Sequence, residues 1–254
     1  MSEHFPGRKL RYYLTVPGPC PYLPGQEERK VFVHLPPLEA ISVNDQLSAI
    51  GFRRSQNIAY RPACQNCRAC QSVRIPVRRY VMSRSDKRVL KTNRDLAKAF
   101  VEAEASREQF DLLQKYLKAR HPDGGMMDMT WPDLVAMIED TLVRTHLIEY
   151  RLDGRLVACV LVDALNDGLS LVYSFYDPEL MTRSLGRFII LDHVEQAQRA
   201  GYGYVYLGYW VKGSPKMDYK ARYRPLEALT DFGWQDVPVS PLPLPPTPVS
   251  MKRV

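Results

Sequence analysis

Residues 145–176 have the sequence THLIEYRLDGRLVACVLVDALNDGLSLVYSFY, and this stretch decides the fold of the chain. Asp153-Gly154 and Asn166-Asp167-Gly168 interrupt it, and both are typical of the tight turns that join antiparallel strands. The apolar runs on either side of the turns predict strands over 145–151, 155–165 and 169–176. The stretch therefore predicts an antiparallel meander.

Helical patterns lie on both sides of the predicted meander. Ser106 with Gln109 and Thr130 with Asp133 have the spacing of capping boxes, which begin helices. The flanking elements are predicted as helices over 106–121, 130–143 and 184–200 and a strand over 204–211. This order is similar to that of the GNAT acyltransferase fold, in which the acyl donor lies where the central strands separate. We therefore expect an α/β (α+β) fold class, with a GNAT-like acyltransferase domain built on a mixed or antiparallel sheet.

Length and composition set the expected domain organisation. A chain of 254 residues suits one large or two modest domains. We expect a smaller, cysteine-containing N-terminal domain packed on the GNAT-like domain, followed by a proline-rich disordered tail, with boundaries 1–104, 105–236 and 237–254. A basic helix is predicted from Asp86 to about Phe100. No run approaches the ~18 apolar residues of a membrane span and the N-terminus lacks a signal-peptide core, so a cytoplasmic protein is expected.

The charge of the chain is positive and unevenly distributed. The formal net charge is +7, and residues 51–94 contain twelve lysines or arginines against one acid, Asp86. A block this one-sided repels itself unless an anion faces it, and nucleic acid is the commonest such anion. Residues 207–229 form a second basic segment with interleaved tyrosines, a combination that suits phosphates and nucleobases. The alternative for this segment is an ordinary solvated loop.

Three of the five cysteines form a tight cluster, Cys64-x-x-Cys67-x-x-Cys70, to which Cys20 could supply a fourth ligand. Thiolates bind zinc and iron–sulfur clusters well, so this set is a candidate site for Zn or an Fe–S cluster. The arginines close to it in sequence would lower the thiol pKa values. The alternative is that the cysteines are buried small residues or oxidisable thiols.

Three segments together resemble the aminoacyl-tRNA–protein transferases. They are Cys20-Pro-Tyr-Leu-Pro, residues 51–77 (GFRRSQNIAYRPACQNCRACQSVRIPV) with 83–91 (SRSDKRVLK), and residues 173–197 followed by 208–229. The family includes eukaryotic arginyltransferases and the shorter bacterial aspartate/glutamate leucyltransferases, and the length of this chain is similar to that of the bacterial group. Leu23 stands where the eukaryotic pattern has a second cysteine, so the metal or cluster of those relatives is not carried over.

The resemblance implies transfer of leucine from Leu-tRNA to the N-terminal α-amine of proteins that begin with Asp or Glu. The product would carry a degradation signal of the N-degron (N-end rule) pathway, and the implied partners are Leu-tRNA and those acceptor proteins. Because the donor is an activated ester, the chemistry itself requires no cofactor. Positioning of the substrates and stabilisation of the oxyanion can supply most of the acceleration.

The resemblance also assigns roles to residues. Asp177, in the FYDP segment at a predicted strand end, is the candidate that orients or deprotonates the acceptor amine; a simple Asp177-Pro178 turn is the alternative. A carboxylate on the acceptor calls for arginine, although the same arginines could bind tRNA phosphate. The predicted acceptor-binding residues are Arg53, Arg54, Tyr60, Ser72 and Arg74. The predicted tRNA-binding residues are Lys87, Arg88, Lys91, Arg183, Lys216, Tyr219, Lys220, Arg222, Tyr223 and Arg224.

Three other functions remain open from the sequence. Arginyl transfer to the same acceptors would need an acidic donor pocket, and acids are sparse near the predicted core. An acetyl-CoA-dependent GNAT enzyme would need a complete glycine-rich pyrophosphate loop, whereas Arg187 and Phe188 follow Gly186 here. A non-catalytic metal- and RNA-binding module would explain the cysteines and the charge, but not the transferase-like meander.

Overall fold

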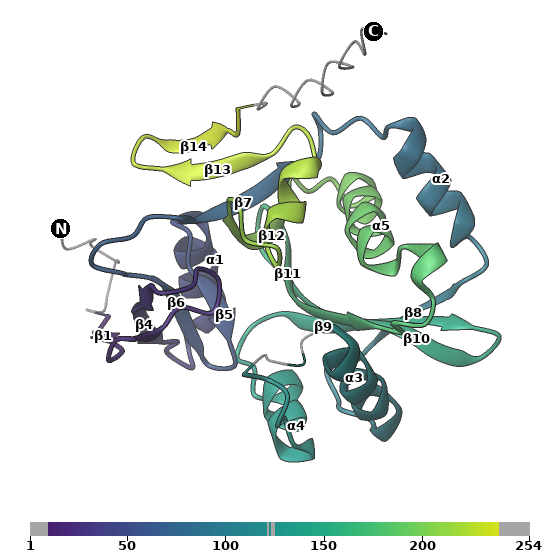
Figure 1. Ribbon diagram of the computed structural model, residues 1–254, viewed down its shortest axis with the longest axis horizontal. Coiled ribbons are helices and arrows are strands. Elements are labelled where there is room, and N and C mark those ends of the chain that lie inside the picture. The colour runs from purple at the N-terminus through teal and green to yellow at the C-terminus, as the bar shows by residue number, and fades with distance from the viewer. Residues whose placement is uncertain (1–9, 121, 123–124, 239–254) are drawn as a thin grey trace, which may run out of the picture.

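A large mixed sheet runs through the molecule in a computed structural model that describes residues 10–120, 122 and 125–238 (Figure 1). Within that part, the strand order is β14-β13-β7-β12-β11-β10-β9-β8. The strands are β7 (Cys70–Pro76), β8 (Ala97–Val101), β9 (Thr145–Leu152), β10 (Arg155–Ala164), β11 (Gly168–Tyr176), β12 (Tyr204–Val211), β13 (Glu227–Thr230) and β14 (Gly233–Asp236). The antiparallel meander β9-β10-β11 is therefore confirmed.

The pair β11 and β12 is parallel, and it is paired only at its start. Gly168, Leu169 and Ser170 lie opposite Tyr204, Val205 and Tyr206, and no register partners follow. Gly168 permits this close approach, because a Cβ there would lie 2.3 Å from the Tyr204 carbonyl oxygen. Beyond these residues β11 continues beside β10 and β12 beside β7, so the two strands separate in the middle of the sheet.

Helices cover both faces of the sheet. In Figure 1, α5 (Leu185–Arg199) lies on one face, and α3 (Arg107–Arg120) and α4 (Trp131–Glu139) lie on the other. Leu113 and Leu117 of α3 pack with Phe175 of the sheet in one buried cluster. On the opposite face, Leu191 and Val194 of α5 pack in another. The order helix, helix, meander, helix, strand and the two covered faces confirm the mixed α/β, GNAT-like fold class.

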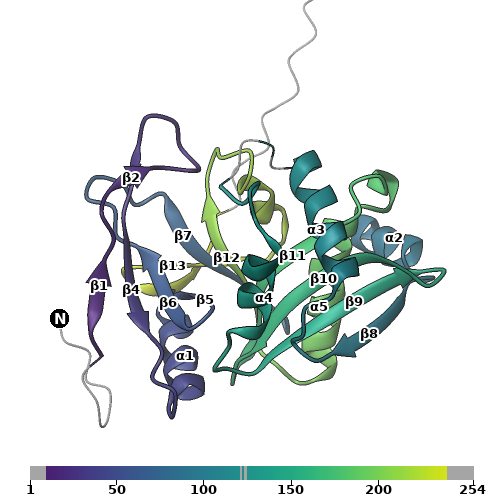
Figure 2. The same cartoon turned by 90° about the horizontal axis from the view of Figure 1, so that it is seen from below.

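A smaller four-stranded sheet lies on one side of the large sheet (Figure 2). Its order is β1 (Tyr12–Leu14), β4 (Lys30–His34), β6 (Ile58–Pro62) and β5 (Arg53–Ser55); α1 (Ala40–Ala49) packs against it, and β2 (Gly18–Pro19) pairs with β3 (Glu27–Glu28). Val33, Leu47 and Ala59 form the centre of its own core. Arg54 fastens this sheet to the large one, because its Nε and Nη2 donate to the Asp163 carboxylate of β10 at 2.6 and 2.8 Å.

The predicted basic helix from Asp86 to about Phe100 is wrong in its second half. The helix α2 (Arg84–Thr92) ends at Asn93, whose buried side chain donates to the Val89 and Arg183 carbonyls at 2.9 and 2.8 Å. The chain then becomes extended, and Ala97–Val101 is β8, paired with β9. Similarly, the helix predicted over 130–143 ends at Glu139.

The predicted domain boundaries stay a prediction. Strands β7 and β8 come from residues 1–104 but hydrogen-bond within the large sheet, so the N-terminal part contributes to both sheets. The predicted tail, apart from residues 237–238, lies outside the described residues. None of the helices in the described part is long and apolar enough to cross a membrane.

Candidate active site

Arg53 occupies the point where β11 and β12 separate. Its Nη2 donates to the carbonyl oxygen of Leu171 at 2.6 Å. Leu171 comes one residue after Ser170, the last residue of β11 that is paired with β12. On β12, its guanidinium lies against Gly208, which has a φ of 76° and where a Cβ would stand 2.8 Å from the Arg53 Cζ. Glycine is needed there both for its φ and for the space. The buried Nη1 of Arg53 has no hydrogen-bond partner among the described residues.

Lys220 lies against the next residue of β12. It belongs to the short helical turn η2 (Asp218–Arg222) that follows the strand, and its Nζ donates to the Tyr209 carbonyl oxygen at 2.6 Å. The side chain is buried, with 6% exposed, and Met217 Sδ lies 3.4 Å from Nζ. Burial, and secondarily the charge of Arg53, lowers the pKa of Lys220 to about 7.

Side chains of β12 hold the segment that follows the strand and also the neighbouring strand β6. Trp210 Nε1 donates to Asp218 at 3.1 Å, and Tyr209 Oη donates to the Tyr60 carbonyl oxygen at 2.9 Å. Tyr219 is 42% exposed, so its ring is accessible for stacking. This part of the chain therefore combines a buried cation with an exposed aromatic face.

Two arginines predicted to bind the acceptor already have carboxylate partners. Arg54 makes the buried pair with Asp163 described above. Arg74 Nε donates to Glu227 at 2.8 Å, and its guanidinium lies 3.5 Å from the centre of the Tyr204 ring and 4.2 Å from that of Trp234. Both arginines are therefore satisfied within the protein.

Of the two predicted polar helpers of the acceptor site, Ser72 uses its side chain within the protein, and Tyr60 is held through its backbone and ring. Ser72 Oγ donates to the Gly51 carbonyl oxygen at 2.7 Å, which fastens β7 to the turn before β5. Tyr60 accepts from Tyr209 through its backbone, and its ring lies 6.2 Å from that of Tyr209. Of the five predicted residues, Arg53 alone is placed with a buried N–H that lacks a partner in the described part.

Asp177 lies directly after β11 and is 1% exposed. Its carboxylate is held by Lys115 Nζ at 2.9 Å and Arg155 Nη1 at 2.5 Å, and it also accepts from the Glu179 N–H. Burial raises the pKa of Asp177, but the hydrogen bonds from Lys115 and Arg155 outweigh burial and lower it overall. These contacts are those of an anchor between α3 and β10, and the catalytic role of Asp177 stays a prediction.

The predicted tRNA-binding residues fall into two groups. Lys87, Arg88 and Lys91 on α2 are exposed and have no ion-pair partner in the described part of the chain, and the same holds for Lys216 and Arg222 beyond β12. The second group faces the protein. Arg183 pairs with Asp95 at 2.8 and 2.9 Å, Arg224 donates to the Val237 carbonyl oxygen at 2.5 Å, and Tyr223 and Lys220 are buried.

The prediction missed two further cations of the exposed group. Arg84 is exposed at the start of α2, and Arg94 is exposed in the turn that follows the helix. The spacing of Arg84 from Lys87 and Arg88 was a signal available in the sequence, since residues three and four apart share a helix face.

The four cysteines lie in one neighbourhood. Burial, followed by the charges of Cys20, Cys64 and Cys67, raises the pKa of the Cys70 thiol to about 11. The expectation that nearby arginines lower the thiol pKa is therefore wrong for Cys70. In the described ranges, no group of three or more His, Cys, Asp or Glu side chains is arranged to hold a metal ion, so the residues as placed do not fit the expected Zn or Fe–S site.

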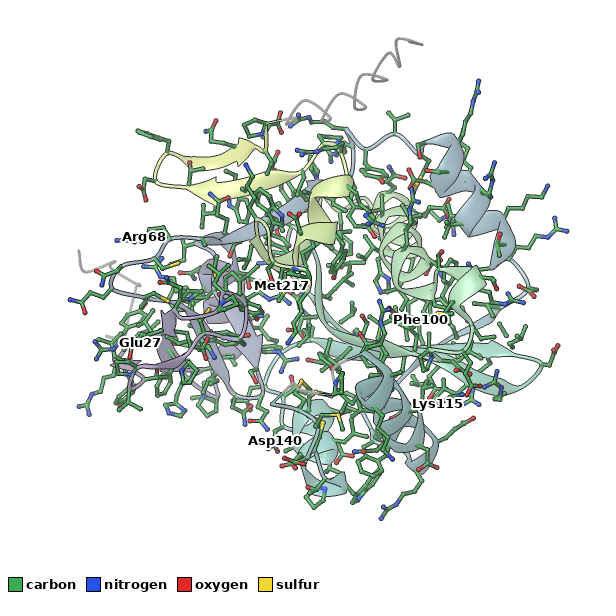
Figure 3. All side chains as sticks on the ribbon, in the orientation of Figure 1. Glu27, Arg68, Phe100, Lys115, Asp140 and Met217 are labelled. Carbon is green, nitrogen blue, oxygen red and sulfur yellow. The ribbon has the colours of Figure 1, made fainter. Side chains whose placement is uncertain are left out.

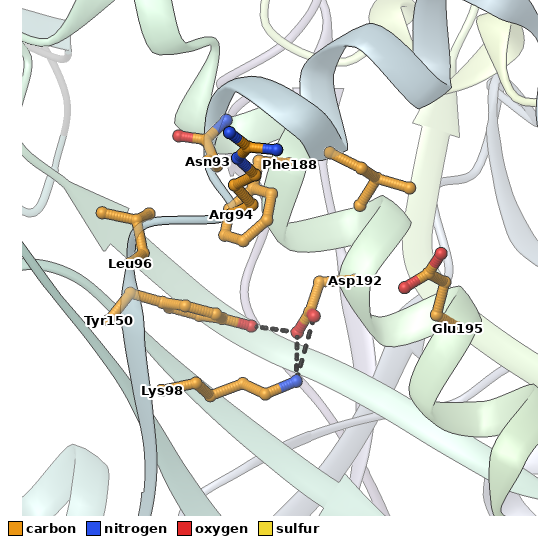
Figure 4. Close-up of a pocket in the computed structure, with 9 residues that line it drawn as sticks. Asn93, Arg94, Leu96, Lys98, Tyr150, Phe188, Asp192 and Glu195 are labelled. Atoms are coloured by element: carbon orange, nitrogen blue, oxygen red, sulfur yellow. Dashed lines mark hydrogen bonds and ion pairs between the residues drawn. The ribbon is translucent and has the colours of Figure 1, made fainter.

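A pocket of about 230 Å³ lies between α2, β8, β9 and α5, with Asn93 and Arg94 in its lining. Figure 4 shows Asp192 among its lining residues, where the carboxylate accepts from Tyr150 Oη at 2.6 Å and from Lys98 Nζ at 3.0 Å. The sequence did not single out these residues. Because the buried carboxylate is fully bonded, this cluster joins α5 to the outer strands.

Comparisons with known proteins match both halves of the chain to one family. Residues 18–88 match the family described as "Arginine-tRNA-protein transferase, N terminus", and residues 108–230 match "Arginine-tRNA-protein transferase, C terminus". The aspartate/glutamate leucyltransferases of Caulobacter vibrioides and Phenylobacterium zucineum are 65% and 64% identical over 240 residues, which cover 92% of this chain and 86% and 93% of theirs. That of Parvibaculum lavamentivorans is 53% identical over 241 residues, 94% of this chain and 100% of its own.

Solved structures give a weaker likeness. The C-terminal domain of a putative lysylphosphatidylglycerol synthetase from Agrobacterium fabrum aligns with a TM-score of 0.40 and 14% identity, over 56% of this chain and 47% of that one. The L-PGS structure from Bacillus licheniformis aligns with a TM-score of 0.44 and 9% identity, over 59% and 48%. These values are too low to support conclusions about this chain.

The strands that separate between two helical layers are arranged as in the GNAT acyltransferase fold. The matches over both halves of the sequence then make the class specific, because the relatives are enzymes that move an amino acid from tRNA to protein. The chain belongs to the aminoacyl-tRNA–protein transferase family, among relatives named aspartate/glutamate leucyltransferase. The family resemblance predicted from the sequence is confirmed.

Proposed function

We propose that this protein transfers leucine from Leu-tRNA to the N-terminal α-amine of proteins that begin with Asp or Glu, and so creates an N-terminal degradation signal. The observation that carries the proposal is the 64–65% identity over 92% of the chain to relatives named for that activity. Both substrates occur in the cytoplasm, which is the compartment we assign.

The reaction joins the acceptor nitrogen to the leucyl carbonyl carbon. The neutral amine attacks the ester, a C–N bond forms, the C–O bond to the terminal ribose breaks, and the amine proton leaves with the ribose oxygen. A free α-amine has a pKa of about 8, so about a quarter of it is neutral near pH 7.5 without a strong base. Alignment of the substrates and stabilisation of the oxyanion then contribute most to the rate.

The separating strands are a suitable place for this attack. Peptide groups of β11 beyond Ser170 and of β12 beyond Tyr206 have no register partners in each other. Their N–H groups that face the gap can donate to an oxyanion or to the backbone of a bound acceptor. We assign the ester carbonyl to this gap, with Arg53 at its closed end.

The exposed cations are assigned to the donor tRNA. The face of α2 that carries Lys87, Arg88 and Lys91 binds backbone phosphate, which needs charge but no base-specific geometry. Lys216 and Arg222 continue the contact toward the gap, and Tyr219 stacks on a terminal base. Arg183, Tyr223 and Arg224 hold the protein fold around these contacts, as their internal hydrogen bonds and burial indicate.

A transfer assay tests the proposal. Purified full-length protein is mixed with labelled Leu-tRNA or Arg-tRNA and with peptides that begin with Asp, Glu, Ala or Lys. Leucine is expected on the Asp and Glu peptides only. Transfer from neither tRNA would overturn the proposal, and transfer from Arg-tRNA alone would replace leucine by arginine as the donor.

A further inference from the structure

Two buried cations lie against consecutive residues of β12. The Arg53 guanidinium contacts Gly208, and Lys220 Nζ is bonded to the carbonyl oxygen of Tyr209 at 2.6 Å. Arg53 reaches this place from β5, and Lys220 from η2, so two distant parts of the chain each contribute one cation to it. Both lie at the point where β11 and β12 separate.

Neither cation has a carboxylate partner in the described part of the chain. Arg53 and Lys220 donate to backbone carbonyl oxygens, of Leu171 and Tyr209, while Arg53 Nη1 is buried and unbonded. The neighbouring arginines differ, because Arg54 pairs with Asp163 and Arg74 with Glu227. Burial of an unpaired cation costs free energy, and burial of two together costs more. This arrangement is suited to an anion that arrives from outside.

We propose that Arg53 and Lys220 together form the subsite for the side-chain carboxylate of the acceptor's N-terminal Asp or Glu. This inference rests on the proposed function, and it assigns Lys220 to the acceptor instead of the tRNA. One carboxylate oxygen accepts from Arg53 Nη1 and the other from Lys220 Nζ. The acceptor α-amine, one or two methylenes away, then lies in the gap between the strands.

The site can open with a small change. The half-buried Met217 side chain covers Lys220, with its Sδ 3.4 Å from Nζ, and Figure 3 places Met217 near the centre of the molecule. An unbranched thioether has three rotatable bonds, so a carboxylate can displace it without movement of the strands. The flexible stem of Lys220 adapts to the difference in length between Asp and Glu.

A different role for Lys220 makes a distinguishable prediction. A neutral lysine could accept the proton of the acceptor amine, and its loss would then lower kcat for every acceptor alike. A carboxylate subsite instead acts in binding, and its loss raises KM only for acceptors that carry the carboxylate. Asparagine is the matched acceptor, because it keeps the shape of aspartate without the charge.

The test uses full-length protein with Leu-tRNA and peptides that begin with Asp, Glu or Asn. Wild-type transfer to the Asp peptide is measured first, and its absence would refute the proposed function and not this subsite specifically. In Lys220→Met we expect KM for the Asp peptide to rise roughly 10-fold or more, while the inhibition constant of the Asn peptide stays within about 2-fold. Lys220→Arg retains the charge and should retain most of the preference for Asp over Asn.

Controls keep the test decisive. Lys212→Met changes an exposed lysine just after β12 that has no assigned contact, and it should leave the ratio of the Asp-peptide KM to the Asn-peptide inhibition constant unchanged. If Lys220→Met turns over too slowly, peptide affinity by calorimetry replaces KM, and if it fails to fold, Arg53→Met is tested in the same way. The proposal would be overturned if the folded variant kept the wild-type ratio of the Asp-peptide KM to the Asn-peptide inhibition constant. It would also be overturned by an equal loss of kcat for all acceptors.

Discussion

Arg53 donates to the carbonyl oxygen of Leu171 at 2.6 Å, and this bond joins the small N-terminal sheet to the point where the central strands separate. The bond takes the place of a strand-to-strand hydrogen bond in the interrupted ladder. The N-terminal part of the chain therefore contributes to the candidate site, because it supplies the cation at the closed end of the gap.

The contact between Arg53 and Gly208 predicts the effect of one methyl group. In Gly208→Ala the new Cβ would lie 2.8 Å from Arg53 Cζ, so the guanidinium must move and kcat/KM for Asp peptides should fall at least 10-fold. The positive φ adds about 1–2 kcal/mol of destabilisation.

Gly213→Ala is the matched control for that variant. Gly213 has a φ of 77°, but nothing lies within 4 Å of the added Cβ. Urea unfolding should show a similar loss of stability for both variants, while transfer kinetics should show a loss of activity for Gly208→Ala alone. Equal activities would remove Arg53 from the site.

Asp177→Asn separates an anchoring role from a catalytic one. Because two cations hold the carboxylate, we expect a loss of about 1–3 kcal/mol of unfolding free energy at pH 7 and little change in kcat for the folded enzyme. The lowered pKa of Asp177 means that its contribution is present above the unfolded pKa of about 4 and is lost as pH falls through the lower folded value. The difference in stability between wild type and variant should thus shrink in acid. A kcat reduced 100-fold or more would restore Asp177 as the base.

The titration of Lys220 makes the free energy of unfolding depend on pH in a second, higher pH range. Its folded pKa is lowered to about 7, so between that pH and about 10.4 the unfolded state binds more protons and stability rises with pH. Cys70, Tyr209 and Tyr219 lie around the amine together with Arg53, and burial raises the pKa of Cys70, Tyr209 and Tyr219 above their ordinary values. The measurement is urea unfolding at pH 7, 8 and 9, in which wild type should gain stability relative to Lys220→Met at each step. A constant difference would show that burial does not lower the pKa of Lys220 in the folded protein.

The exposed face of α2 predicts a salt effect. The double variant Lys87→Met with Lys91→Met should raise KM for Leu-tRNA and reduce the slope of log KM against log salt by about 0.7–0.9 for each tRNA phosphate that is no longer neutralised. Lys118→Met is the control, because this exposed lysine lies on α3, on the opposite face of the sheet (Figure 1). An unaltered slope in the double variant would place the tRNA elsewhere.

The parts of the fold that local chemistry specifies were predictable from the sequence. The turns at Asp153-Gly154 and Asn166-Asp167-Gly168 fixed the meander, and the capping box of Ser106 and Gln109 fixed the start of α3. Strand β8 was missed because a short run that continues a basic helix becomes a strand only through its pairing with β9, some 50 residues later.

The candidate site was predictable as a set of residues but not as a geometry. Arg53 and Arg54 are adjacent on a strand, so their side chains point to opposite sides. One meets Leu171, 118 residues away, and the other meets Asp163, 109 residues away. No local signal distinguishes these two arginines, and the same holds for Arg74, whose partner Glu227 is 153 residues distant.

The measurement that tests the central claim most directly is a competition for the acceptor. Wild-type protein with labelled Leu-tRNA receives equal amounts of two peptides that differ only in an N-terminal Asp or Asn, and the products are separated by mass. We predict that at least nine-tenths of the leucine is on the Asp peptide in wild type, and that this preference is lost in Lys220→Met but kept in Lys212→Met. A preference that survives in Lys220→Met would contradict the account.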